Sequence, residues 1–149
     1  MSHLKIVLQR VSSARVSVNS ETVGEIQNGL LLLTGFGRSD ASVDLDRIVE
    51  KVLNLRVFEN ASGQLDRSVK DIGGSILLVP QFTLLAHTRK GRRPDFTEAM
   101  APSGAEKKFG QLVSKFKQLT DLNIETGQFG TDMSVVLTNE GPFTLLLEY

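Results

Sequence analysis

Hydrophobic and polar positions alternate early in the chain, and this pattern predicts strands. Residues 4–9 predict a strand, and residues 14–18 alternate apolar with polar side chains as a half-buried strand does. A polar turn at residues 19–22 separates the second of these strands from a short strand expected over residues 23–26. Residues 30–33 are all leucine, and a wholly apolar run predicts a strand covered on both faces.

Two later segments have helical spacing. Apolar residues recur every three or four positions over residues 45–53, which predicts a helix that Ser39 or Ser42 could cap. A second helix is expected after Pro102, where Ser103 and Glu106 have the spacing of a capping box. Its apolar stripe consists of Phe109, Leu112, Val113, Phe116 and Leu119.

The remaining apolar segments are short, and each predicts a strand. They cover residues 56–58, 75–79, 123–126, 133–138 and 143–148. In chain order, the strands of residues 4–33 precede the first helix, two strands lie between the helices, and three strands follow the second helix. Because two helices cannot cover both faces of a doubly wound sheet, we expect an α/β fold. It is a single domain over residues 1–149, with two packed β-sheets and both helices on one side.

Composition narrows the function classes. The chain has 149 residues with 17 basic and 17 acidic side chains, so a binder of nucleic acid that is cationic over its whole surface is excluded, whereas a local basic patch is not. It has no cysteine, no apolar run long enough to span a membrane and no secretion signal at its start. A cytoplasmic protein that does not bind membranes is expected.

Few side chains are suited to catalysis. The chain has only two histidines, and a catalytic triad would depend on His87 without the usual motif around a serine nucleophile. One usable histidine and no cysteine do not predict a metal site, and no cofactor motif is present. If the protein is an enzyme, backbone groups, hydroxyls or the substrate itself must do the chemistry.

Residues 80–84 form the first candidate site. Pro80 cannot continue a central ladder, so the N–H groups of Gln81, Phe82 and Thr83 are expected to be free, and free N–H groups can stabilise an oxyanion. The alternative is a strand that simply bends.

Residues 139–144 form the second candidate site. Asn139, Gly141 and Pro142 are turn formers, so an ordinary hairpin turn explains them. The functional alternative is that Gly141 and Pro142 present their carbonyl groups to a ligand.

Residues 87–94 form a loop that concentrates positive charge. Arg89, Lys90, Arg92 and Arg93 have no acidic neighbour before Asp95, which suits a phosphate backbone. The alternative is a solvated surface loop.

Taken together, these stretches resemble the D-aminoacyl-tRNA deacylase family. Its two characteristic motifs are S-Q-F-T-L and N-x-G-P-x-T. The second is matched by Asn139, Gly141, Pro142 and Thr144, and the first is matched except that Pro80 stands in place of serine.

The resemblance implies a homodimer in which Gly141 and Pro142, joined by a cis bond, enter the partner's active site. There they reject L-amino acids. The implied substrate is tRNA carrying a D-amino acid, or tRNA(Ala) mischarged with glycine, and the ester is cleaved to amino acid and tRNA with help from the ribose 2′-hydroxyl. Phe82 and Thr83 N–H would hold the oxyanion. No cofactor, metal, DNA or membrane is implied.

The resemblance also assigns individual residues. Thr83 is expected to orient the substrate rather than attack it, because no general base flanks it. Arg10 is expected to fix the Gly-Pro segment. The expected substrate-binding residues are Gln81, Phe82, Phe129, Met133, Asn139 and Thr144, and the expected tRNA-binding residues are Arg89, Lys90, Arg92 and Arg93.

Two alternatives remain open. A related animal deacylase has proline at the position of Pro80, followed by Gln-Ala-Thr, and uses a trans Gly-Pro to remove L-alanine from tRNA(Thr). Phe82 and the complete second motif favour the D-specific enzyme. The other alternative is an RNA-binding module without catalysis.

Overall fold

The sheet is organised by strand β1 (Lys5–Val18), which pairs with three other strands. In the computed structural model, which describes residues 3–149, the first half of β1 pairs with β3 (Gly29–Gly35). Its second half pairs with β2 (Glu21–Ile26), and β8 (Ser134–Glu148) runs along the other edge of both halves. All three pairings are antiparallel. The predicted strands 4–9 and 14–18 are therefore one continuous strand.

Two parallel strands extend the sheet beyond β3. These are β6 (Ser75–Pro80) and β7 (Ile124–Thr126), which gives the order β2-β1-β3-β6-β7. Successive residues of β3 enter different cores, because Leu30 and Leu32 pack in one cluster whereas Leu31 packs in another. The prediction that the leucine run is covered on both faces is confirmed.

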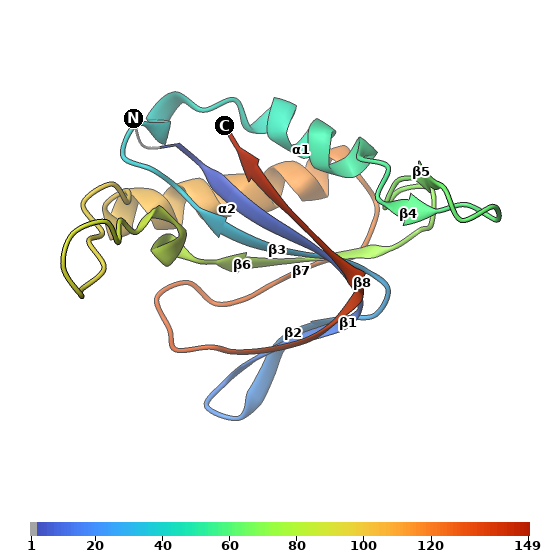
Figure 1. Ribbon diagram of the computed structural model, residues 1–149, viewed down its shortest axis with the longest axis horizontal. Helices are drawn as coiled ribbons and strands as arrows, with labels where there is room; N and C mark the ends of the chain where they lie inside the picture. The colour runs from blue at the N-terminus through green and yellow to red at the C-terminus, as the bar shows by residue number, and fades with distance from the viewer. Residues whose placement is uncertain (1–2) are drawn as a thin grey trace.

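Both helices cover the same face of the sheet (Figure 1). Helix α1 (Leu45–Asn54) and helix α2 (Pro102–Leu119) lie where the apolar spacing placed them. Their buried side chains are Ile48, Val49, Val52 and Leu53 from α1, and Ala105, Phe109, Leu112 and Phe116 from α2. Within residues 3–149, no helix is long and apolar enough to cross a bilayer.

The predicted helix caps are wrong. Asp44 caps α1, and its side chain accepts a hydrogen bond from the Arg47 N–H at 3.2 Å. Ser42 instead ends a short 3-10 helix, η1 (Asp40–Ser42), one turn earlier in the chain. Helix α2 begins with Pro102 and has no side-chain cap, because proline at the first position brings no N–H that needs a partner.

The opposite face of the sheet is covered by the sheet itself. The second half of β1, together with β2 and the first half of β8, folds under β3 and β6, and Figure 1 shows the β1–β2 hairpin on the side away from the helices. The two packed layers were predicted, but they belong to one hydrogen-bonded sheet, because β1 crosses between them without ending. A Cβ on Gly24 would lie 2.5 Å from the Thr126 carbonyl oxygen, so β2 closes tightly on the end of β7.

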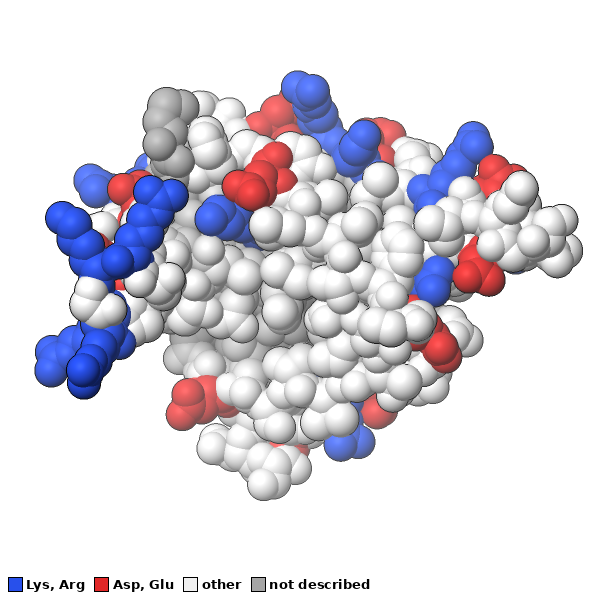
Figure 2. Space-filling model, in the orientation of Figure 1, with Lys and Arg blue, Asp and Glu red and all other residues white. Residues whose placement is uncertain are grey.

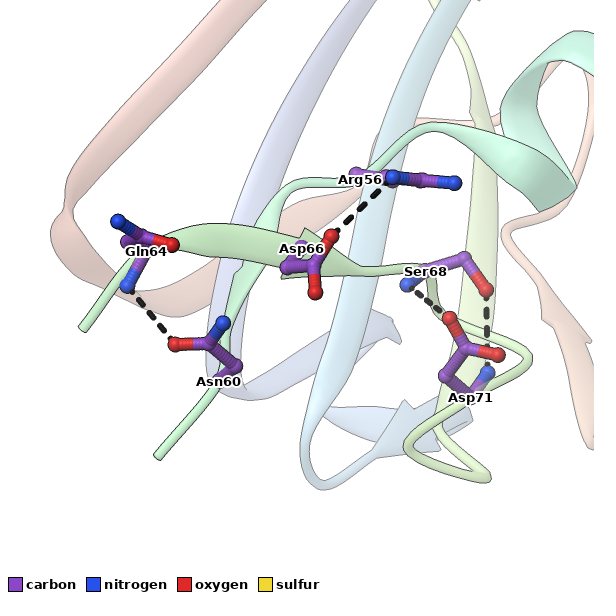
Figure 3. Close-up of polar contacts among 6 residues, drawn as sticks. All are labelled: Arg56, Asn60, Gln64, Asp66, Ser68 and Asp71. Carbon is purple, nitrogen blue, oxygen red and sulfur yellow. Dashed lines mark hydrogen bonds and ion pairs between the residues drawn. The ribbon is translucent and has the colours of Figure 1, made fainter. Parts of the chain in front are cut away.

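A small ribbon between α1 and β6 adds a strand that the sequence did not predict. It consists of β4 (Phe58–Glu59) and β5 (Leu65–Arg67). Figure 3 shows the contacts that hold this region, including the ion pair from Arg56 to Asp66 at 3.1 Å. The Asn60 side chain accepts from the Gln64 N–H at 3.0 Å and so closes the turn.

Just after the ribbon, Ser68 and Asp71 exchange two hydrogen bonds. The Ser68 N–H donates to the Asp71 carboxylate at 2.8 Å, and the Asp71 N–H donates to the Ser68 hydroxyl at 3.1 Å (Figure 3). The backbone donation from Ser68 is the main reason why the pKa of Asp71 is lowered. These contacts order the connection into β6.

Strand β8 also corrects the predicted order of elements. Residues 133–138 and 143–148 were expected to be two strands, but both halves of β8 pair with β1 in the same direction. The chain therefore does not reverse between them, and the expected hairpin turn at residues 139–144 is absent. The observed order is three strands, a helix, three strands, a helix and two strands.

Candidate functional site

A cavity of about 890 Å³ opens beside the end of β6 and the start of α2. It contains four of the six predicted substrate-binding residues, Gln81, Phe82, Phe129 and Met133. Thr83 follows directly in the 3-10 helix η2 (Phe82–Leu85) but does not line the wall. Segments far apart in the sequence thus meet at this end of the parallel strands.

Two main-chain donors at this site are unpaired. In the part of the chain that the structure describes, the N–H groups of Phe82 and Thr83 have no acceptor, as the sequence predicted. Gln81 differs, because its N–H donates to the Thr34 carbonyl at 2.7 Å. The prediction of a free Gln81 N–H is therefore wrong, since β3 still offers an acceptor one residue beyond Pro80.

The same register explains why a proline can end a central strand. Neighbouring residues of a strand direct their N–H positions to opposite sides. Because Gln81 faces β3, the nitrogen of Pro80 faces the other side, where the β6–β7 pairing ends at Leu78 and Thr126. The last bond on that side runs from the Gly127 N–H to the Leu78 carbonyl at 2.8 Å and needs no donor from Pro80, so the ladder ends at the proline.

Ionisable groups are scarce in the cavity wall. Among the described residues that line it, Asp132 alone carries an ionisable side chain. His87 lies outside the cavity and is exposed. Within residues 3–149, no three His, Asp or Glu side chains gather in a way that could hold a metal ion. The polar groups left to act on a ligand are mainly backbone groups, the Gln81 amide and threonine hydroxyls.

Aromatic rings form much of the apolar wall. Phe82 and Phe96 meet edge to face with ring centroids 5.2 Å apart, and Phe109 and Phe129 lie 6.3 Å apart. The sequence did not assign Phe96 or Phe109 to the site. In the sequence, Phe109 is recognisable only as part of the apolar stripe of α2. Phe96 stands just after the basic loop, and this position could have indicated that it belongs to the site.

Gly141 and Pro142 lie on a bulge of β8, away from this cavity. Between the pairs Gln9–Thr144 and Val11–Asn139, β8 has the four residues 140–143 where β1 has only Arg10. The Gly141–Pro142 peptide bond is cis, and both residues are exposed. The bulge therefore projects from the protein surface.

Arg10 anchors this bulge from the facing strand. Its Nε donates to the Glu140 carbonyl at 3.0 Å, and its Nη1 donates to the Val57 carbonyl at 2.8 Å. The guanidinium also lies 4.9 Å from the ring centroid of Phe143, in a cation–π contact. A Cβ on Gly141, where φ is +132°, would come within 2.9 Å of Arg10 Nη2, so the position suits only glycine.

Asn139 and Thr144 close the base of the bulge. The Asn139 amide donates to the Thr144 hydroxyl at 2.8 Å, and the Asn139 side-chain oxygen accepts from the Phe143 N–H at 2.6 Å. Neither side chain lines the cavity of its own chain. Within one chain the two residues hold the bulge, and a role in substrate binding stays a prediction.

The basic loop begins and ends beside the cavity. His87 and Asp95 exchange backbone hydrogen bonds of 2.8 and 2.9 Å, which clamp its two ends. All four cations, Arg89, Lys90, Arg92 and Arg93, are exposed. Figure 2 shows a concentration of positive charge at this end of the molecule. Phe96 follows the clamp and belongs to the cavity wall, so the charge lies at the cavity's edge.

A buried carboxylate supports the wall from behind. Asp40 is 4% exposed, and its carboxylate accepts the Gly37 N–H at 2.6 Å, directly after the wall residues Gly35 and Phe36. Burial raises the pKa of Asp40, and the hydrogen bond from Gly37 counteracts part of this effect. Asp40 thereby fixes the backbone on which this part of the wall depends.

These features define a small α/β protein whose site is built from backbone and aromatic groups. The chain belongs to the D-Tyr-tRNA(Tyr) deacylase family, whose sequence model matches residues 7–148. Two expectations drawn from the motifs are thereby confirmed. These are the resemblance itself and the assignment of the chain to a hydrolase class.

Relatives agree over nearly their full lengths. The chain is 49% identical to a D-aminoacyl-tRNA deacylase of Halalkalibacterium halodurans, with 97% of this chain and 99% of the relative covered. It is 45% identical to a D-aminoacyl-tRNA deacylase of Thermosipho africanus, with 97% of each covered.

Solved structures share the fold. One titled c-Myc DNA unwinding element binding protein has a TM-score of 0.91 at 39% identity, covering 97% of this chain and 98% of that one. Another, titled as a probable eukaryotic D-amino acid tRNA deacylase, has a TM-score of 0.85 at 19% identity, covering 99% and 100%, and shows likeness of fold alone.

Proposed function

We propose that the protein hydrolyses the ester bond that joins a D-amino acid to the 3′-terminal ribose of tRNA, and so removes wrongly charged amino acids in the cytoplasm. The unpaired N–H groups of Phe82 and Thr83 carry this proposal. They stand beside a cavity almost without ionisable side chains. A carbonyl oxygen placed against both donors gains most when it becomes an oxyanion.

The chemistry then needs little from side chains. Water attacks the ester carbonyl, the bond from the carbonyl carbon to the ribose oxygen breaks, and a proton of the water passes to that oxygen. The neighbouring ribose 2′-hydroxyl relays the proton, and the products are free amino acid and tRNA. The protein contributes position and oxyanion stabilisation, which can supply a large share of a rate enhancement.

Handedness is judged by a second copy of the chain. In a homodimer, the exposed bulge with Gly141 and Pro142 enters the partner's cavity, where its carbonyl groups face the Cα substituents of the bound amino acid. A rigid wall rejects by clash, which discriminates more sharply than a small gain in attraction. Arg10 supports this role by holding the bulge in place. Glycine has no side chain to clash, so glycyl-tRNA(Ala) is a substrate too.

The basic loop binds the phosphates of the tRNA. Its four exposed cations at the cavity's edge suit a polyanion whose end lies in the cavity. Asn139 and Thr144, at the base of the bulge, contact substrate only across the dimer.

Turnover tests the function. Purified protein at a hundredth of the substrate concentration should convert all D-tyrosyl-tRNA to free tyrosine and leave L-tyrosyl-tRNA intact. Equal rates on both forms would contradict the chirality proposal. L-alanyl-tRNA(Thr) belongs in the same assay, because Pro80 stands where the related animal enzyme also has proline.

A non-catalytic nucleic-acid binder is the second candidate. The basic loop would serve it equally, and one solved structure of this fold is titled a DNA-binding protein. Binding of tRNA or DNA without release of amino acid from any ester would favour this candidate and exclude the enzyme.

A further inference from the structure

The rim of the cavity carries two exposed aromatic rings next to the basic loop. Phe82 is 55% exposed and Phe96 is 39% exposed, although both line the cavity. Their exposure at the mouth of the cavity leaves both rings accessible to a ligand that extends out of it.

The geometry of the pair leaves ring faces open. Their planes meet at 63°, so the edge of one ring contacts the face of the other. In such a pair, the ring that contributes its edge keeps both faces available for a planar group.

The backbone that carries each ring is ordered by local hydrogen bonds. The Thr97 N–H donates to the Asp95 carboxylate at 2.9 Å, and the Ala99 N–H donates to the Phe96 carbonyl at 3.0 Å, which fixes the turn that carries Phe96. Phe82 begins η2. A backbone segment ordered before binding loses little conformational entropy when a ligand arrives.

Positive charge lies within a short distance of this pair. Phe96 is three residues after Arg93, so their Cα atoms are at most about 10 Å apart. Aromatic rings combined with a positively charged track are the usual means of binding single-stranded nucleic acid, because every base has a face that can stack. An acidic protein surface would complement the basic loop but not the rings, and an apolar protein surface would complement the rings but not the loop.

We infer, on the basis of the proposed function, that Phe82 and Phe96 form a stacking platform for a nucleobase of the single-stranded 3′ end, one that precedes the terminal adenosine. The terminal nucleoside and its amino acid occupy the cavity. The strand leaves over the rim, one base stacks on the aromatic pair, and the phosphates pass along the basic loop. Phe96 is thus a specificity residue that reads single-strandedness rather than sequence.

Two esters separate this role from catalysis. One is D-tyrosine esterified to adenosine alone, and the other is D-tyrosine esterified to the trinucleotide CCA. We expect the normal protein to prefer the trinucleotide ester in kcat/KM. Phe96→Leu, which keeps apolar bulk but has no aromatic face, should lose about tenfold of this preference, mainly through KM. Phe96→Tyr should keep it.

The kcat/KM values for the two esters are measured on the same preparation of each variant. Partial unfolding lowers both values equally and does not change their ratio. Leu65→Ala is the matched control, because Leu65 is an exposed apolar side chain on the distant β5. An unchanged preference in Phe96→Leu overturns the platform, and so does equal loss on both esters. Loss of self-association in Phe96→Leu would assign the ring to the contact between copies and also overturn it. Failure of the normal protein on every ester would overturn the proposed function instead.

Discussion

At the scale of single residues, the site is defined by what its side chains lack. Thr83 has a hydroxyl beside the proposed oxyanion donors. The Gln81 amide donates to this hydroxyl, and within residues 3–149 no basic side chain forms a hydrogen bond with it. A hydroxyl in this setting binds or orients and is not activated for attack. The orienting role of Thr83 stays a prediction, and the sequence supports it because the motif and the shortage of histidines are both visible there.

Thr83→Ala is therefore expected to keep much of the activity, within about tenfold in kcat on D-tyrosyl-tRNA, since only one neutral hydrogen-bonding group is lost. Thr22→Ala, on an exposed position of β2, is the matched control. A loss of a thousandfold or more, as for a missing nucleophile, would return Thr83 to the chemistry.

Arg10→Met should relax the rejection of L-amino acids. The bulge loses the hydrogen bond to the Glu140 carbonyl and the contact with Phe143, so its position is less fixed. We expect the ratio of D to L hydrolysis to fall about tenfold. Arg15→Met, an exposed arginine on the same strand, should leave the ratio unchanged. Unaltered discrimination in Arg10→Met would separate Arg10 from the chiral step.

At the scale of elements, regular patterns were predictable and interruptions were not. Helices α1 and α2 and the doubly covered β3 were predicted because their apolar periodicity reflects burial directly. The bulge in β8 was read as a possible hairpin turn, because asparagine, glycine and proline favour both. Only the ladder with β1 decides between them, and that pairing is remote in sequence. The cap of α1 was mispredicted because Ser39, Ser42 and Asp44 all stand near its start. The cap of α2 was mispredicted because Pro102, which has no N–H, opens that helix.

The basic loop acts as an element, so its charges are best tested together. Arg92→Gln with Arg93→Gln should weaken tRNA binding and make the dependence of log K on log salt shallower by about two, since two phosphate contacts are lost. Lys107→Gln with Lys117→Gln removes the same charge from the exposed side of α2 and is the control. If the slope of log K against log salt is the same in the loop variant as in the control, the loop does not contact phosphates and is only a solvated surface loop.

At the scale of the whole molecule, the cavity exists because the sheet brings distant segments to one end. Gln81 follows β6, Phe109 belongs to α2, and Phe129 precedes β8. No local pattern encodes this meeting. Gln81 was singled out only as the residue after Pro80, Phe129 was identified only through the family resemblance, and Phe96 and Phe109 were missed. The two packed layers could be predicted, because the sequence indicates many strands and only two helices.

Asp40 makes global stability depend on pH. Its folded-state pKa is raised, mainly by burial, and the Gly37 and Leu4 backbone groups together with His3 and Lys108 lower it in part. Ionising it in the folded state is therefore unfavourable. No penalty exists below the unfolded pKa of about 4, and the full penalty is present once the pH passes the raised pKa.

Asp40→Asn, which keeps an acceptor for the Gly37 N–H, should thus gain free energy of unfolding relative to the normal protein as the pH rises from 3.5 to 7. Urea denaturation at both pH values measures this. Asp121→Asn at an exposed position is the control. If the difference in free energy of unfolding between Asp40→Asn and the normal protein is the same at both pH values, the burial of Asp40 does not make stability depend on pH.

The bulge opposite Arg10 has a consequence for how such proteins can change. The β1–β8 pairing resumes on both sides of residues 140–143, although a second register shift follows the pair Val11–Asn139, so no pair sets the length of the protruding tetrapeptide. Residues can be added to it or removed from it while the pairs on either side stay as they are. The distance by which it protrudes can therefore change separately from the sheet. A grafted copy would need two paired strands, an arginine on the facing strand, and the asparagine and threonine that close its base.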